Sequence, residues 1–88
     1  MKVYKKQVWL NRKGSSSTGS VVAFDGIDKD WEGELFRNTF IQINDCRRSI
    51  TLHKTENDSI PQFIQKLAKL EYVIHDFKEH LRGNLDKD

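Results

Sequence analysis

An amphipathic helix in the last third of the sequence constrains the fold more than any other feature. Ser59 and Gln62 have the spacing of a capping box, in which the serine hydroxyl accepts from the Gln62 amide and the Gln62 side chain returns a bond. Pro61 suits the first turn, where amides have no helical partner. Gly83 provides a stop signal. The sequence therefore predicts a helix over about 60–82.

Apolar side chains recur on one face of this helix, alternately four and three residues apart. A helix of about 22 residues is roughly 33 Å long, whereas a strand of about seven residues spans only about 23 Å. We expect the helix to extend past its sheet and a second copy to cover the excess, although the helix folding wholly onto its own curved sheet is an alternative. The stripe is Phe63, Leu67, Leu70, Ile74, Phe77 and Leu81, with the predicted dimer interface from Leu67 onward.

The residues before the helix alternate between apolar and polar side chains, which predicts β-strands. Eighty-eight residues suit one domain, so residues 1–88 are expected to form a single β4α domain of the α+β class. Its sheet, at about 3–54, is predicted to be antiparallel and four-stranded. The two expected hairpins pair 3–11 with 20–25 and 38–45 with 48–54.

A glycine-bounded loop lies between the first two predicted strands. The spacing of Gly14 and Gly19 resembles a phosphate-binding P-loop, which needs Lys and then Ser or Thr after the second glycine. Ser20 and Val21 fill these places, so the nucleotide-binding interpretation is rejected. The glycines are expected to serve a hairpin, and the serines between them are expected to be mobile.

Residues 25–37 are predicted to form a polar connection. The acids after Asp28 imitate an EF-hand loop with Gly33 at its sixth position, but Thr39 stands where a bidentate glutamate is needed. We therefore expect a solvated loop without calcium. Trp31 and either Leu35 or Phe36 are expected to pack against the core.

The sequence contains no recognisable catalytic or metal-binding pattern. His75 and His80 lie five apart, about 140° around a helix, and cannot share a metal on one face. Cys46 lacks the apolar pocket and third group that nucleophilic catalysis needs. We predict no enzyme, cofactor or metal. The lone cysteine, the lack of a signal-like N-terminus and the lack of an apolar run of about 18 residues favour a cytoplasmic protein without a membrane span.

The charge is distributed unevenly along the chain. Residues 1–54 carry ten Lys or Arg and six Asp or Glu, a net charge of +4, and residues 55–88 carry five and seven, a net charge of −2. A positive sheet would favour a polyanion. Alternatively, the lysines only protect the sheet edges from aggregation.

Strand alternation predicts one apolar face and one face that combines rings with polar groups. Ile41 and Ile43 should pair with Ile50 and Leu52 towards the core. The opposite face should carry Lys5, Gln7, Trp9, Phe40, Gln42, Thr51 and His53. Rings with cations between them suit single-stranded nucleic acid, although packing against 25–37 or another chain would also explain them. The predicted binding residues are Lys5, Lys6, Trp9, Arg12, Lys13, Phe40, Arg47, Arg48 and His53.

This arrangement resembles the single-stranded-DNA-binding transcriptional coactivator family, which has a Whirly-like topology. In that family a basic segment enters a strand of the pattern Arg/Lys-Gly-Ile-x-Leu shortly before a helix. Here the chain reads Arg47-Arg48-Ser49-Ile50-Thr51-Leu52, with serine in place of the glycine and a longer gap, 53–59, before the helix. The resemblance implies a homodimer through the helices and a sheet face for single strands.

A second hypothesis requires no nucleic acid. The protein would then be an interaction module, such as a small regulator or inhibitor, using the ring-bearing face or the helix stripe. The basic first strand, with Lys5 and Lys6, favours nucleic acid over this alternative.

Overall fold

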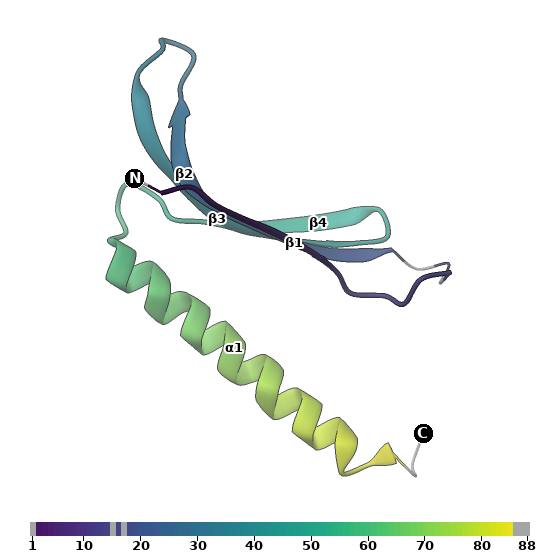
Figure 1. Ribbon diagram of the computed structural model, residues 1–88. Coiled ribbons are helices and arrows are strands. Elements are labelled where there is room, and N and C mark those ends of the chain that lie inside the picture. The colour runs from purple at the N-terminus through teal and green to yellow at the C-terminus, as the bar shows by residue number, and fades with distance from the viewer. Residues whose placement is uncertain (1, 15, 17, 86–88) are drawn as a thin grey trace. The chain divides into compact units, whose positions relative to one another are not determined.

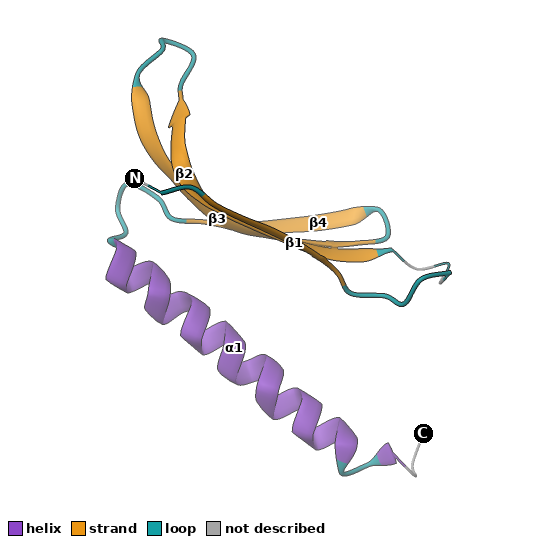
Figure 2. Cartoon of the chain, viewed as in Figure 1, coloured by secondary structure: helices purple, strands orange, loops and turns teal. Residues whose placement is uncertain are grey.

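The fold is α+β, with a four-stranded antiparallel sheet followed by one C-terminal helix, as predicted (Figures 1 and 2). The computed structural model describes residues 2–14, 16 and 18–85, so Ser15 and Ser17 of the predicted mobile loop lie outside the described residues. The chain forms two compact units, Met1–Lys54 and Thr55–Asp88, each considered by itself below. The elements are β1 (Tyr4–Trp9), β2 (Gly19–Lys29), β3 (Leu35–Asp45), β4 (Arg48–His53) and α1 (Ile60–Arg82).

The strands lie in the order β1-β2-β3-β4, so each strand pairs with its neighbour along the chain. Strands β2 and β3 are longer than predicted and form a hairpin with each other, because their pairing continues to Lys29 opposite Leu35. The prediction of a polar connection over 25–37 was therefore wrong. The pairing of β1 ends at Asp25 and that of β4 at Phe40. Residues 26–38, called the arm below, thus extend beyond both outer strands (Figure 1).

The acids that resemble a calcium-binding loop lie around the turn between β2 and β3, and one of them, Asp30, forms the hydrogen bonds of this turn. The Asp30 amide donates to the Glu34 carbonyl and the Gly33 amide to the Asp30 carbonyl, both at 3.0 Å. The Asp30 carboxylate accepts from the amides of Glu32 and Glu34 at 2.9 Å. Gly33 has φ +84°, the left-handed conformation that glycine adopts without steric cost. These residues form a short hairpin loop in which the last residue, Gly33, is left-handed, a common kind of connection between antiparallel strands.

The side chains expected to pack beside this turn are exposed. Trp31 is 91% exposed, and Leu35 and Phe36 are exposed too. The prediction that they pack against the core was wrong, because they belong to the arm and not to a loop folded back over the sheet.

The strand register assigns each side chain to one of two faces. Ile41 lies opposite Leu52 and Ile43 opposite Ile50, which confirms the predicted pairing of these four residues. The same rows continue across β2 and β1. We call this the apolar face, after its apolar side chains Val8, Val21, Ala23, Ile41, Ile43, Ile50 and Leu52. A sheet with such a face needs a second layer to cover it.

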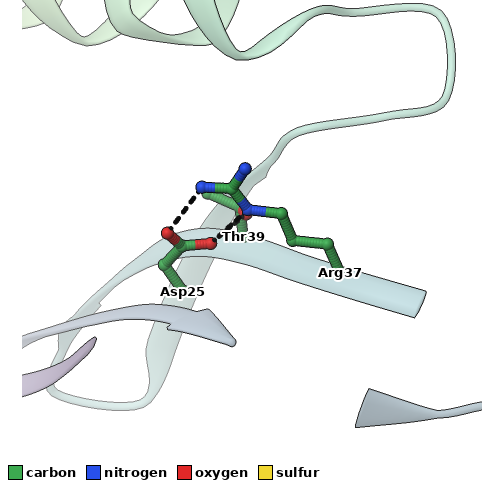
Figure 3. Close-up of polar contacts among 3 residues, drawn as sticks. All are labelled: Asp25, Arg37 and Thr39. Atoms are coloured by element: carbon green, nitrogen blue, oxygen red, sulfur yellow. Dashed lines mark hydrogen bonds and ion pairs between the residues drawn. The ribbon is translucent and has the colours of Figure 1, made fainter. Parts of the chain in front are cut away.

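The side chains of Asp25, Arg37 and Thr39 bind one another at the base of the arm (Figure 3). They lie on the same side of the sheet as the apolar face. Arg37 Nε and Nη2 donate to the two carboxylate oxygens of Asp25, both at 2.9 Å, and Thr39 Oγ1 donates to Asp25 Oδ1 at 2.7 Å. The hydrogen bond from Arg37 is the largest cause that lowers the pKa of Asp25. The cluster links β2 to β3 at the base of the arm.

The predicted helix is confirmed, including its first turn. Ser59 Oγ accepts from the Gln62 amide at 3.2 Å, and Gln62 Oε1 accepts from the Ser59 amide at 2.7 Å. Pro61 lies in the first turn, and Gly83 follows the last helical residue. No helix within the described ranges is both long enough and apolar enough to cross a membrane.

Hydrophobic burial is sparse in the part of the chain that the structure describes. Phe63, 4% exposed, is the one hydrophobic residue there that counts as buried. On the helix stripe, Leu67 and Leu70 are half-buried, while Phe77 is 61% exposed. On the apolar face of the sheet, Ile50 is exposed.

The turn between β3 and β4 contains a strained residue. Cys46 and Arg47 join the paired residues Asp45 and Arg48, and Cys46 has φ +56°. Among the described residues it is the one non-glycine residue with positive φ. A side chain in this conformation costs about 1–2 kcal/mol.

We expect Cys46→Gly to stabilise the sheet, because glycine adopts this conformation without that cost. The expected gain is about 0.5–1 kcal/mol, since glycine also loses more backbone entropy on folding. Urea unfolding followed by circular dichroism measures it. Cys46→Ala is the matched control because it removes the thiol but keeps the Cβ atom. Equal stabilisation by both variants would show that the thiol, and not the backbone, is responsible.

A second prediction concerns acid stability. The folded pKa of Asp25 lies below its ordinary value of 3.8, so its contribution is complete above about pH 4 and is lost as the pH falls through the lowered pKa. We expect Asp25→Asn to unfold at lower urea concentration than the wild type at neutral pH. The difference should shrink below about pH 4. A difference that persists unchanged in acid would contradict a role for the Asp25 charge.

Candidate nucleic-acid interface

The second face of the sheet, called the ring face below, collects the side chains that the sequence assigned to it. The register aligns them in three rows across the four strands. Lys5, Gln7 and Trp9 of β1 share the face with Phe40 and Gln42 of β3 and with Thr51 and His53 of β4, as predicted. The full rows are Lys5–Phe24–Phe40–His53, Gln7–Val22–Gln42–Thr51 and Trp9–Ser20–Asn44–Ser49.

Three rings form a continuous row across β2, β3 and β4. The ring centroids of Phe24 and Phe40 are 5.6 Å apart with planes inclined by 23°, and those of Phe40 and His53 are 5.4 Å apart with planes inclined by 48°. Sequence reasoning missed Phe24, because it assigned no faces to the second strand. The available signal was the spacing of Val22 and Phe24, because residues two apart in a strand have their side chains on the same face.

A glycine makes room for one end of this row. A Cβ atom on Gly26 would lie 2.9 Å from Phe24 Cζ, closer than any real contact, so the ring lies against the glycine backbone. Glycine in a strand often marks such a close approach. The position of the Phe24 ring therefore depends on Gly26.

Hydrogen bonds between neighbouring strands link polar side chains of the ring face. Gln42 Nε2 donates to Thr51 Oγ1 at 3.1 Å, and Asn44 Nδ2 donates to Ser20 Oγ at 3.2 Å. These cross-strand bonds hold the amides in one orientation. They give the ring face a defined polar surface beside the aromatic row.

Trp9 lies at the end of the ring face where two connections meet. Its side chain is 67% exposed. The Cys46 amide donates to the Thr18 carbonyl at 2.9 Å, which joins the β3–β4 turn to the loop after β1. The Gly19 amide also donates to Asn11 Oδ1 within this loop. Both connections carry exposed cations, and we call this region the basic end: Arg12, Lys13, Arg47 and Arg48.

Not every predicted binding residue reaches the ring face. Lys6 lies opposite Ala23 and therefore on the apolar face. Arg48 lies opposite Asp45 on the same side as Ile50, so it reaches the ring face only around the end of the sheet. The predicted dimer residues belong to α1, along one stripe of the helix.

The ring face combines three kinds of side chain. It presents ring surfaces, exposed lysine and arginine cations and fixed amides. Across the described ranges, no three His, Cys, Asp or Glu side chains come together to hold a metal ion.

No protein-family model, no curated protein and no solved structure matches the chain at a significant level. The resemblance to the single-stranded-DNA-binding coactivators therefore stays a prediction.

Proposed function

We propose that the protein binds single-stranded nucleic acid on the ring face. The row of Phe24, Phe40 and His53, with Trp9 exposed on the same face, carries this proposal. Bases stack on such rings with about 1–3 kcal/mol each, with little dependence on sequence. The resemblance stated above adds transcription regulation to the proposed role.

The spacing of the rings favours an extended strand. Neighbouring centroids lie 5.4–5.6 Å apart, whereas stacked bases rise about 3.4 Å per nucleotide. A strand must unstack for successive bases to meet separate rings. Double-stranded DNA cannot present its bases in this way, so we expect it to bind more weakly.

The cations flank this row on two sides. Lys5 continues the aromatic row at the β1 edge, and Arg12, Lys13 and Arg47 lie at the end occupied by Trp9. Lysine and arginine there are placed to contact the phosphates while the bases meet the rings.

We expect Trp9→Ala to weaken the binding of a labelled single-stranded oligonucleotide by roughly five- to a hundredfold, the loss of one stacked base. Fluorescence anisotropy measures this, and binding should weaken steeply between about 50 and 200 mM salt. Trp9 is largely exposed, so its removal should leave the fold intact. Trp31→Ala, at the far end of β2 and β3, is the matched control and should bind normally. Absence of binding by the wild type at low salt would refute the proposal.

We also propose that α1 mediates a homodimer. The stripe from Leu67 to Leu81 repeats at alternating spacings of three and four residues, as in helices that pack side by side. Phe77 and Ile74 are both exposed on it. A second copy can bury these side chains together with their counterparts.

We expect light scattering to give a mass near twice the chain mass of 10.3 kDa for the wild type, and one chain mass for Phe77→Glu. A buried charge without a partner opposes association strongly. Tyr72→Glu is the control, because Tyr72 is exposed and lies half a turn away from the stripe. A wild-type mass of a single chain at high concentration would exclude the dimer.

The proposed setting is the cytoplasm. Cys46 is free and exposed, and exposed thiols persist in reducing compartments.

A further inference from the structure

The tip of the arm carries a concentrated negative charge that the ring face does not use. Four acids and one lysine give residues 28–34 a net charge of −3. None of these acids forms an ion pair with a described residue. The Asp30 carboxylate accepts hydrogen bonds from two amides of the turn. Asp28, Glu32 and Glu34 are all exposed.

The arm also exposes apolar and backbone groups. Trp31 is 91% exposed at its tip, and Ile27 and Leu35 are exposed further along the arm. Neither outer strand pairs with the arm, so both of its edges have backbone groups available. A two-stranded ribbon alone is marginally stable in water, and open edges invite pairing with another chain. These features point to a macromolecular partner.

The charge of the arm selects the class of that partner. A net negative tip repels phosphates, so the arm is unsuited to nucleic acid. It suits a protein surface rich in arginine and lysine.

Such a surface lies at the opposite end of β2 and β3. Residues 45–48 together with Arg12 and Lys13 have a net charge of +3. The eleven residues of β3 separate the two ends by about 35 Å, several times the Debye length of about 8 Å at physiological salt. The two charged ends cannot neutralise each other within one sheet, but the ends of two sheets can.

We propose that the arm tip of one copy docks on the basic end of a second copy, head to tail. The acids meet Arg12, Lys13 and Arg47, and Trp31 supplies the large exposed ring that arginine stacks upon. The contact is heterologous, since two different surfaces meet, so it propagates from copy to copy, into a ring if the rotation between copies closes and into an open chain if it does not. It is separate from the α1 contact and does not depend on the proposed nucleic-acid binding.

Sedimentation velocity on nucleic-acid-free full-length protein tests this inference, and every protein compared, including the one called wild type in this test, carries Phe77→Glu so that the α1 contact adds no association of its own. We expect the sedimentation coefficient of the wild type to rise with concentration at about 50 mM salt and to lose this rise at about 500 mM, because exposed charges are then screened. Trp31→Ala should also reduce the rise. A coefficient that does not change with concentration at low salt would overturn the proposal.

Paired charge reversals identify the surfaces. Asp28→Lys with Glu32→Lys makes both ends basic, and Lys13→Glu with Arg47→Glu makes both ends acidic. Each double variant alone should lose the concentration dependence, and an equimolar mixture should regain it. Lys66→Glu with Lys69→Glu on α1 is the control and should behave as the wild type. Circular dichroism confirms the fold of each variant. Variants that associate as the wild type does, or a mixture that fails to associate, would refute the head-to-tail contact.

Discussion

The pairing register between β2 and β3 is the interaction on which the rest of the sheet depends. Shifting it by one residue would move every side chain of one strand to the opposite face. The Asp30 and Gly33 turn sets this register at one end, and the Asp25–Arg37–Thr39 cluster holds it at the base of the arm. Phe24 thereby lies opposite Phe40, and the outer strands add Lys5 and His53 to the same row.

The same two strands also separate the charges of the sheet. Their connections at one end carry arginine and lysine, and their turn at the other carries acids. Trp9 and the cations of the basic end therefore share one region, which supports the proposed contact with a polyanion, while the acidic turn lies at the other end of β2 and β3. This separation also gives each sheet two complementary ends.

The sequence predicted best where the signals were local. Ser59, Gln62 and Gly83 bounded the helix correctly, because capping depends on neighbouring residues alone. Alternation assigned Trp9, Phe40 and His53 to one face. It failed at 25–37, because the frequent acids there indicated a polar connection, whereas this segment contains the end of β2, a turn and the start of β3. The contribution of Phe24 and the link between Cys46 and Thr18 depend on strand pairing, which a single strand pattern does not define.

The simple strand order also bears on how quickly the sheet forms. Because β1, β2, β3 and β4 pair only with chain neighbours, no pairing has to wait for distant segments to meet. Closing short loops costs little entropy, and proteins of low contact order fold quickly. The sheet can thus assemble by successive hairpin closures, which limits the time during which its unpaired edges are open to aggregation.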